Sequence, residues 1–467
     1  MINIKVDSRK VKEGDTFVAL RGLTSDGHEF CQKALDNGAT LLVVDHELDI
    51  DGEQLVVNDT QVWLKEYLKE HYADKINEMK ILGITGTNGK TTTAYLTYQL
   101  LNKLGTKTAY IGTIGFYIPG KEPVELNNTT PILLELYELL LEAREAECEA
   151  VMMEVSSHAL DQDRIYGLDF KVGAFTNLTQ DHLDYHKSMN DYLKAKLKLS
   201  KIVSGKMIVN VDDSFGKVFE EAAIDPVTLG RNGKDIRIVG FENTEDGTNI
   251  NFSIDNLPYI VETKLKNEFN VYNYLTAIGF AHALGYSIND IIDVTPLVGA
   301  PKGRCEQIKV NGGLAVVDYA HTPDAVEKII ESFKKTTTGK VITLVGCGGD
   351  RDKTKRPIMG DIASKKSDYV VFTSDNPRTE DPEQILRDIL EGVKTDNYEV
   401  EVDRKKAIVK ALDLIEPGDA VLILGKGHED YQIVGKEKHH FDDAEEVKNY
   451  VFNKKANYDV NPVLETQ

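Results

Sequence analysis

Apolar runs that predict strands alternate along the chain with amphipathic runs that predict helices. After Lys80, the sequence KILGITGTNGKTTTAYLTYQLLNKLG passes from an apolar strand through a glycine-rich loop into a helix. Further strands are predicted at KTAYIGTIG, AVMMEV, VGAFTNL and GKMIVNV, with helices at PILLELYELLLEAREA and MNDYLKAKLKLSKIV. This order is typical of a doubly wound, mainly parallel sheet, and it predicts one central domain over residues 80–302.

Two more α/β segments flank the central one. In residues 1–79, VKEGDTFVAL and LLVVD predict strands, and VWLKEYLKEHY predicts an amphipathic helix. Inside the central domain, residues 225–266 are polar and interrupted by glycines, which predicts antiparallel hairpins before a helix at 273–284. In residues 303–467 strands and helices alternate again, at KVITLVGCGGDRD, PIMGDIASKKS, DYVVFTSDNPR, PEQILRDILEGV and DAVLILGKGHED. We therefore expect an α/β protein with a small N-terminal domain, a central doubly wound domain and a C-terminal Rossmann-like domain.

Composition narrows the class of protein. A length of 467 residues suits about three domains, and a formal net charge of -21 argues against nucleic-acid binding. The N-terminus MINIKVDSRK has no signal-peptide pattern, and no window approaches the apolar length of a membrane helix, so we expect a cytoplasmic protein without a membrane span. The four cysteines form no CxxC pair, which disfavours both a zinc knuckle and a disulfide framework.

The strongest local pattern is a phosphate-binding loop at Gly86-Thr87-Asn88-Gly89-Lys90-Thr91. Its glycines let backbone N–H groups surround phosphate oxygens, Lys90 reaches the terminal phosphates, and the Thr91 hydroxyl suits Mg²⁺. The loop is a compact variant, because Ile84 stands where the general form has its first glycine.

Three polar loops follow predicted strands in the C-terminal segment. They are Gly346–Arg351, the DNPR turn of Asp375–Arg378 and GKGHE at Gly425–Glu429. The first does not fit the dinucleotide pattern GxGxxG. Since ligands collect at the carboxyl ends of parallel strands, we expect the three loops to converge on one crevice.

The chain resembles the Mur ligases in its ordered motifs. These are GTNGKTT, Glu154–His158 (EVSSH), Asn177–His186 (NLTQDHLDYH), Gly303-Arg304, Asp318–His321 (DYAH) and GKGHE, together with Asp7-Ser8-Arg9 and GDTFVALRG. The resemblance implies an ATP-dependent amide-forming enzyme of peptidoglycan precursor synthesis. Its N-terminal domain would bind the UDP end, its central domain ATP, and its C-terminal domain the incoming amino acid. The motifs are most similar to those of members that extend UDP-N-acetylmuramoyl-L-alanyl-D-glutamate (UDP-MurNAc-L-Ala-D-Glu) by its third stem residue.

The resemblance also assigns residues. It implies catalytic roles for Lys90, Glu154, His182 and Lys196, and magnesium binding by Thr91, Glu154, His182 and a CO₂-derived carbamate on Lys196. ATP contacts are implied for Gly86, Thr87, Asn88, Gly89, Lys90, Thr91, Asn273, Arg304, Asp318 and His321. Contacts to the UDP-linked dipeptide are implied for Ser8, Thr129, Thr130, Ser156, Gln162 and Arg164. Amino-acid contacts are implied for Arg351, Asp375, Asn376, Pro377, Arg378, Gly425 and Glu429.

Plainer interpretations stay open for several of these residues. Spacing alone favours Lys196 as one lysine of a solvated helix face. His182 and His186, at i and i+4, would instead suit zinc, although the HExxH glutamate and a third ligand are missing. Arg304 and its ATP-site partners would serve equally as interdomain hydrogen-bond donors and acceptors.

Arg378 decides the expected amino acid. Meso-2,6-diaminopimelate differs from L-lysine by a second carboxylate, and a guanidinium matches a carboxylate with two parallel hydrogen bonds. We expect diaminopimelate as substrate and a monomeric enzyme. The alternatives are the same ligase using L-lysine, a folylpolyglutamate synthetase-like ligase, and a catalytically silent ATP-binding relative.

Overall fold

The computed structural model describes residues 2–22, 25–244 and 247–459, and the strands of these residues form four sheets. The chain divides into two compact units, residues 1–83 with 106–171 and residues 84–105 with 172–467. Among the described residues no helix combines the length and the apolar character needed to cross a membrane.

The N-terminal segment folds around a small parallel sheet in the order β1-β2-β3-β4. Its strands are β1 (Ile4–Lys5), β2 (Thr16–Val18), β3 (Leu41–Val44) and β4 (Gln54–Val56), and its helices are η1 (Ser8–Lys10), η2 (Gly27–Phe30) and α1 (Cys31–Asp36). Phe17, Leu42 and Val44 pack against Cys31 and Ala34 of α1 to make its core. The predicted strand over residues 11–20 is shorter than expected, because Gly14 turns the chain with a φ of 87°.

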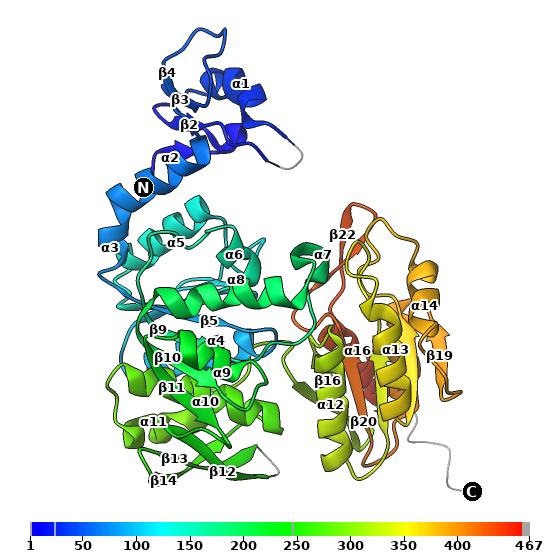
Figure 1. Cartoon of the computed structure of the whole chain (residues 1–467). Helices are drawn as coiled ribbons and strands as arrows, with labels where there is room; N and C mark the ends of the chain where they lie inside the picture. Colours follow the sequence, from blue (N-terminus) through cyan, green and yellow to red (C-terminus); the bar gives the residue numbers. More distant parts are fainter. Residues whose placement is uncertain (1, 23–24, 245–246, 460–467) are drawn as a thin grey trace, which may run out of the picture. The chain divides into compact units, whose positions relative to one another are not determined.

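A long helical segment follows this sheet, coloured blue in Figure 1. It begins with α2 (Thr60–Leu68), where Asp59 accepts hydrogen bonds from two backbone N–H groups of the first turn. A π-helical stretch η3 (Lys69–Ala73) and α3 (Asp74–Ile76) continue it. The predicted helix at residues 62–72 is therefore confirmed.

The central sheet has ten strands in the order β14-β13-β12-β11-β10-β9-β5-β8-β6-β7. They are β5 (Lys80–Thr85), β6 (Thr108–Gly112), β7 (Gly115–Tyr117), β8 (Ala150–Glu154), β9 (Phe170–Phe175), β10 (Val203–Asn210), β11 (Asp225–Gly230), β12 (Ile236–Asn243), β13 (Thr248–Ile254) and β14 (Leu257–Thr263). β6 pairs with β8 in parallel, and β12, β13 and β14 form an antiparallel meander. The sheet is thus mixed, with antiparallel pairs at both ends.

One strand prediction was wrong in its direction. β11 pairs in parallel with both β10 and β12, so the antiparallel hairpins expected over residues 225–266 begin only at β12. The helix α9 (Gly216–Ala222) lies between β10 and β11 and carries the chain back over the sheet, as a parallel pair requires.

The sequence pattern predicted some of the other helices of the central segment, namely those after the phosphate loop, at residues 131–146, at 189–203 and at 273–284. The helices of this segment besides α9 are α4 (Lys90–Lys103), α5 (Leu133–Glu145), α6 (Ser157–Asp161), α7 (Leu183–His186), α8 (Met189–Ile202), α10 (Glu268–Ala283), α11 (Ile288–Val294) and η4 (Thr295–Leu297). α10 packs against α4, the helix that follows the phosphate loop. Residues near the start of α10 are thereby brought to that loop.

The C-terminal sheet has the order β15-β16-β20-β17-β18-β19. Its strands are β15 (Glu306–Val310), β16 (Gly313–Asp318), β17 (Val341–Val345), β18 (Tyr369–Thr373), β19 (Tyr398–Glu401) and β20 (Ala420–Leu424), and a hairpin of β21 (Tyr431–Val434) and β22 (Glu437–His440) follows. All its neighbours are parallel except β15, an edge strand antiparallel to β16.

Helices cover both faces of this sheet, as in a Rossmann-like fold (Figure 1). Apolar side chains of α12 (Pro323–Thr336), α13 (Lys355–Lys366) and α14 (Pro382–Leu390) pack on one face. Those of α15 (Arg404–Asp413) and α16 (Asp443–Asp459) pack on the other. The carboxyl ends of β17, β18 and β20 consequently lie side by side along one edge.

Candidate active site

The phosphate loop lies between β5 and α4 and has the backbone that phosphate binding needs. Gly86 and Gly89 have positive φ values of 149° and 85°. A Cβ on Gly86 would lie 1.8 Å from Thr176 Oγ1, and one on Gly89 would lie 2.6 Å from Asn273 Oδ1. The Lys90 Nζ donates to the carbonyl oxygens of Gly86 at 3.0 Å and Thr87 at 2.9 Å. The ammonium therefore lies folded over the loop whose N–H groups would surround a phosphate.

Polar side chains outside the loop hold Asn88 in place. Asn177 Oδ1 accepts a hydrogen bond from the Asn88 backbone N at 2.9 Å, and Thr176 Oγ1 donates to its carbonyl at 2.7 Å. The Asn88 side chain in turn donates to Asp324 Oδ2 at 2.9 Å. Because Asp324 lies in the first turn of α12, this bond links the loop to the C-terminal segment.

Lys196 of α8 is buried beside this loop. Its side chain is 1% exposed, and its Nζ donates to the Gly86 carbonyl at 2.7 Å and lies 4.7 Å from the centre of the Tyr192 ring. Burial, and the nearby Lys90 charge, hold the pKa of Lys196 well below the ordinary lysine value. The solvated-face interpretation of this lysine is therefore wrong, since the side chain is buried and its environment favours the neutral amine.

Asp181 and His182 stand at the start of the DHLDYH segment. His182 has a φ of 54° and is partly exposed, and its Nε2 lies 3.4 Å from Asp181 Oδ2. Burial favours the neutral carboxyl of Asp181, but the charges of His182, His321 and Lys355 prevail and lower its pKa to about 2. We did not single out Asp181 from the sequence, although it belongs to the same motif.

His186 has a structural environment. It is buried, and its ring packs against Tyr185 and Tyr192 with centroid distances of 4.8 and 5.2 Å. These contacts favour a packing role over the zinc ligand that the i, i+4 spacing left open.

Arg304 and the DYAH segment lie beside the phosphate loop in the same unit. The Arg304 Nη2 donates to Thr91 Oγ1 at 3.1 Å, and its guanidinium lies 4.5 Å from the Tyr319 ring centre. Asp318 accepts hydrogen bonds from the backbone N of Cys305 and of Ala320, each at 2.8 Å, while burial raises its pKa. Burial and the Lys355 charge lower the pKa of His321 to about 4, so this imidazole is neutral at pH 7.

Asn273, in α10, also contacts the helix behind the loop. Its Oδ1 accepts from Thr93 Oγ1 at 3.1 Å, and its Nδ2 donates to Asn270 Oδ1 at 2.9 Å. Of the predicted ATP residues outside the loop, Arg304 thus bonds the loop directly and Asn273 bonds the helix that follows it.

A second network lies in the other unit, around Glu154 and the residues predicted to bind the UDP-linked dipeptide. The buried Glu154 carboxylate accepts from Tyr110 OH at 2.6 Å and from the Thr113 backbone N at 2.9 Å. Thr130 Oγ1 donates to the Glu154 carbonyl at 2.8 Å and accepts from the Ser156 backbone N at 3.0 Å.

Arg164 extends this network through two contacts. It donates to the Thr130 carbonyl at 2.8 Å and to Gln162 Oε1 at 2.9 Å, while Thr129 Oγ1 lies 3.1 Å from Thr113 Oγ1. Ser8 stands apart from these residues, because it lies in η1 and its carbonyl accepts from Asn37 Nδ2 at 2.8 Å.

The three polar loops of the C-terminal sheet do converge, as predicted. The Arg378 Nη1 donates to the Gly349 carbonyl at 2.8 Å, and Asn376 Nδ2 donates to Glu429 Oε2 at 2.8 Å. Gly425 has a φ of 114°, which other residues rarely adopt, and a Cβ there would lie 2.5 Å from Asp375 Oδ2. Arg351 is exposed at the margin of this group.

Lys426 is a residue of this group that we missed from the sequence. It is fully buried, and its Nζ lies 3.2 Å from both Asn376 Oδ1 and Glu429 Oε2. Burial and the Asp375 charge raise the pKa of Glu429, while Lys426 opposes them. Its Nζ also lies 3.9 Å from Asp375 Oδ1, so this cation faces two neighbouring carboxylates, and its place within GKGHE was the only hint in the sequence.

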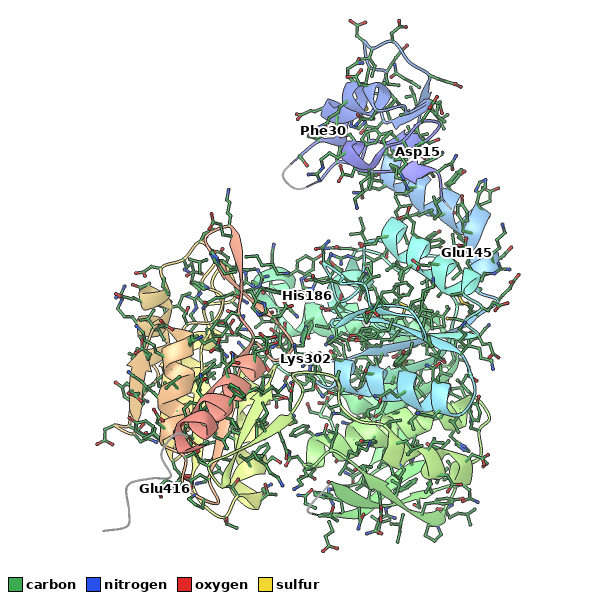
Figure 2. All side chains as sticks on the ribbon, turned by 180° about the vertical axis from the view of Figure 1, so that it is seen from behind. Asp15, Phe30, Glu145, His186, Lys302 and Glu416 are labelled. Atoms are coloured by element: carbon green, nitrogen blue, oxygen red, sulfur yellow. The ribbon has the colours of Figure 1, made fainter. Side chains whose placement is uncertain are left out.

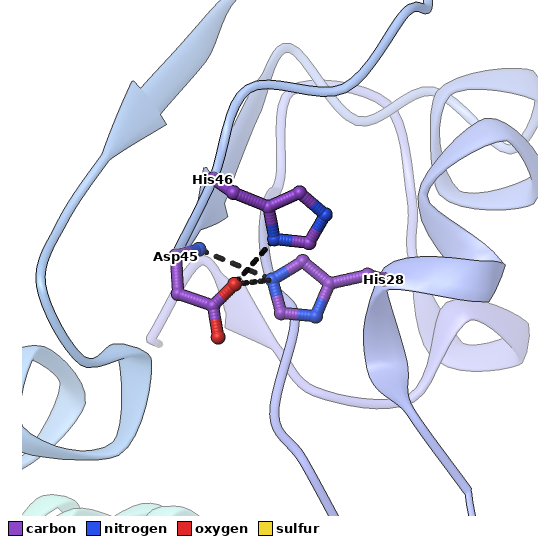
Figure 3. A group of neighbouring side chains, drawn as sticks. All are labelled: His28, Asp45 and His46. Atoms are coloured by element: carbon purple, nitrogen blue, oxygen red, sulfur yellow. Dashed lines mark hydrogen bonds and ion pairs between the residues drawn. The ribbon is translucent and has the colours of Figure 1, made fainter.

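Figure 3 shows a separate group, His28, Asp45 and His46, in the N-terminal segment. One ligand atom from each lies within 4.8 Å of the others, which is a spacing suited to a metal ion. However, Arg21 already binds the Asp45 carboxylate at 2.6 and 3.0 Å, and His28 Nε2 accepts from the Asp45 backbone N at 3.1 Å. We interpret the group as a hydrogen-bond network that joins η2 to the end of β3.

Comparison with known proteins identifies the family. Three family models match, described as Mur ligase family, catalytic domain over residues 2–82, Mur ligase middle domain over residues 84–281, and Mur ligase, glutamate ligase domain over residues 303–427.

Two curated relatives resemble the chain over nearly its whole length. The UDP-N-acetylmuramoyl-L-alanyl-D-glutamate--2,6-diaminopimelate ligase 1 of Clostridium acetobutylicum is 42% identical over 457 residues, covering 96% of this chain and 94% of that one. The ligase of the same specificity from Aquifex aeolicus is 40% identical over 448 residues, covering 95% and 92%.

Solved structures share the fold. One of a UDP-N-acetylmuramoyl-L-alanyl-D-glutamate--2,6-diaminopimelate ligase aligns with a TM-score of 0.67 at 32% identity and covers 97% of this chain and 95% of that one. The folylpolyglutamate synthase of Mycobacterium tuberculosis aligns with a TM-score of 0.66 over 78% of this chain and 92% of its own, but at 16% identity it shows the fold alone. The chain, with its three-domain α/β fold, belongs to the Mur ligase family.

Proposed function

We propose that this chain is the ATP-dependent ligase that joins meso-2,6-diaminopimelate to the D-glutamate of UDP-MurNAc-L-Ala-D-Glu in peptidoglycan synthesis. The curated relatives at about 40% identity over nearly the whole chain carry this activity in their names. The observation that carries the proposal is the gathering of Lys90, Lys196 and Arg304 at the phosphate loop.

The reaction explains why these cations are needed there. The D-glutamate γ-carboxylate attacks the terminal phosphate of ATP, which gives an acyl phosphate and ADP. The amine of diaminopimelate then attacks the acyl carbon, loses a proton, and expels inorganic phosphate to leave the amide. Both steps build negative charge on oxygen, and preorganised cations stabilise such charge. Lys90 and Arg304 are placed to do so, because both contact the Gly86–Thr91 loop.

We expect this reaction to require bound Mg²⁺ and a carbamate on Lys196. Thr91, Glu154 and the carbamate would supply the oxygen ligands that Mg²⁺ prefers, with His182 as a further ligand. Bound Mg²⁺ neutralises phosphate charge during transfer. Lys196 fits the role of a carbamoylated residue, since burial lowers its pKa and so favours the neutral amine, and its Nζ lies 2.7 Å from the Gly86 carbonyl.

Arg378 supports diaminopimelate over L-lysine as the incoming amino acid. Its Nη1 donates to the neutral Gly349 carbonyl, and Asn376 of the same turn donates to Glu429. The distal carboxylate of diaminopimelate would replace that neutral partner and accept two parallel, charge-assisted hydrogen bonds from the guanidinium. L-Lysine has no group to offer at this place.

The remaining assignments rest on the family resemblance. The residues predicted to bind the UDP-linked dipeptide, the domain limits at 79/80 and 302/303, the monomeric state and the cytoplasmic location stay predictions. Purified chain should release phosphate from ATP only when the UDP-linked dipeptide and diaminopimelate are both supplied. Release without either substrate would contradict the proposed function.

A further inference from the structure

The hairpin of β21 and β22 lies outside the core of the C-terminal segment. It forms a two-stranded sheet of its own, separate from the six-stranded sheet. β21 is at most half-buried and β22 is exposed along its whole length, and Figure 2 shows the hairpin projecting from the segment. An isolated hairpin is only marginally stable in water, so its position depends on the residues that it contacts.

The backbone of Arg378 pairs with this hairpin. Its N donates to the Ile433 carbonyl at 3.0 Å, and its carbonyl accepts from the Gly435 backbone N at 2.7 Å. Val434, between these two residues, is the parallel bridge partner of Arg378. The hairpin therefore holds both backbone polar groups of the arginine that we expect to select the amino acid.

The conformation that these bonds hold is an uncommon one. Arg378 has a φ of 52°, in the left-handed region that residues other than glycine rarely adopt. Such a conformation persists where the surrounding contacts enforce it, and these places are often functional. Because the backbone sets the direction of the Cβ, it also sets the direction from which the guanidinium reaches the Gly349 carbonyl.

Gln432 of β21 holds the other end of the DNPR turn. Its Nε2 donates to the Asp375 carbonyl at 2.6 Å, and the next backbone N, that of Ile433, donates to Asn376 Oδ1 at 2.9 Å. The hairpin thus binds the turn at its first and last residues. The Gln432 contact comes from a side chain, so a substitution can remove it without changing the backbone.

We propose that Gln432 is a positioning residue for the choice of amino acid, because it keeps β21 against the turn and so aligns Arg378 with the distal carboxylate. Two parallel hydrogen bonds to a carboxylate require an aligned guanidinium plane, and small errors of position weaken both bonds. L-Lysine has no carboxylate at that end, so its use does not depend on the alignment. The inference rests on the diaminopimelate-adding function proposed above and assigns its selectivity to a second residue.

The test uses Gln432→Met, which keeps the length of the side chain and removes its donor. Gln307→Met, at an exposed glutamine on β15, is the matched control. Steady-state phosphate release gives kcat and KM for each amino acid. Gln432→Met should raise the KM for diaminopimelate about five- to tenfold, as expected for one lost hydrogen bond, with kcat and kcat/KM for L-lysine unchanged. The control should match the wild type throughout.

A double variant shows whether Gln432 acts through Arg378. In Arg378→Ala no guanidinium remains to be aligned, so adding Gln432→Met should change the KM for diaminopimelate by less than about twofold. A purely structural role would instead lower the use of both amino acids and would persist in the Arg378→Ala background.

The tip of the hairpin offers an independent variant. Gly435 has a φ of 61°, and a Cβ there would have no neighbour within 4 Å, so Gly435→Ala disturbs the backbone without a clash. It should also raise the KM for diaminopimelate selectively. Gly285→Ala, with a φ of 97° and equal space, introduces similar strain elsewhere and should leave that KM unchanged.

Three results would overturn the inference: an unchanged KM for diaminopimelate in Gln432→Met, an equal loss for both amino acids, or the full effect in the Arg378→Ala background. Any of them in a chain whose wild type prefers diaminopimelate leaves the proposed function standing. A wild type that uses L-lysine equally well contradicts the proposed function, and this inference with it.

Discussion

The Arg304 guanidinium donates a hydrogen bond of 3.1 Å to the Thr91 hydroxyl. Arg304 follows the segment that leads into the C-terminal sheet, whereas Thr91 is the last residue of the phosphate loop. The contact places a cation from one segment at the phosphate site of the other, and the Tyr319 ring 4.5 Å away fixes its orientation.

Arg304→Ala should therefore lower kcat by about 10²- to 10³-fold, the usual loss when one charge-stabilising donor is removed. Arg304→Lys should recover only part of it, because an ammonium lacks the planar fork. Steady-state phosphate release measures both. The control is Arg387→Ala, an exposed arginine on α14, which should keep wild-type rates. Equal rates for Arg304→Ala and the control would show that this arginine does not stabilise charge in the reaction.

Lys196→Ala should abolish most activity, because no carbamate can form at this position. Added short carboxylates should restore part of the rate by occupying the place of the carbamate. Lys194→Ala, an exposed lysine on the same helix, should behave as wild type. Activity in Lys196→Ala that carboxylates do not raise would argue that the lysine serves by its hydrogen bond to Gly86 alone.

Arg378→Ala should raise the KM for diaminopimelate by about 10²-fold or more, since it would leave the distal carboxylate without its charged partner. Turnover of L-lysine should change little, so the preference between the two amino acids should collapse. The KM of Arg378→Lys for diaminopimelate should lie between those of the wild type and Arg378→Ala, because lysine keeps the charge but lacks the planar guanidinium. If KM rises equally for both amino acids, the arginine supports the loop through Gly349 and does not select the substrate.

The ion pair between Glu380 and Arg356 should make the stability of the protein depend on pH. Its hydrogen bonds to the fully buried Arg356 lower the pKa of Glu380 from 4.5 to about 2. A lowered folded-state pKa means that the stabilisation is complete above pH 4.5 and disappears as the pH falls toward about 2. Glu380→Gln should cost about 1–3 kcal/mol at pH 7, because the buried guanidinium loses a charged acceptor.

Urea midpoints at pH 7, 4 and 3 measure this difference. The gap between wild type and Glu380→Gln should narrow as the pH falls. Glu383→Gln, an exposed glutamate on α14, should show no gap at any of these pH values. A gap of constant size from pH 7 to pH 3 would contradict the role of the Glu380 charge.

Much of the site could be predicted from the sequence, because its chemistry lies in contiguous motifs. The phosphate loop, the DNPR turn and GKGHE each follow an apolar strand, and the parallel order of β17, β18 and β20 brings their loops together. Other features depend on distant partners. The pKa of Asp181 is lowered by its neighbour His182 and also by His321 and Lys355, which are far away in the sequence. The buried Lys426 contacts Asn376, which is on another loop, and Glu429, which is three residues away.

Backbone conformation and strand direction were the features hardest to predict from the sequence. The direction of β11 depends on the crossover through α9, and its polar residues gave no sign of a parallel pairing. Similarly, an Asn before a helix usually predicts an N-cap with an extended backbone. The residues around Asn267 therefore did not indicate its φ of 85°.

The most direct test of the central claim is phosphate release by the purified chain with ATP and UDP-MurNAc-L-Ala-D-Glu, supplied with either meso-diaminopimelate or L-lysine. The account predicts release that requires both substrates, with kcat/KM for diaminopimelate higher by about 10²-fold or more, as expected for one charge-assisted carboxylate contact. Equal use of the two amino acids, or release that needs neither, would contradict it.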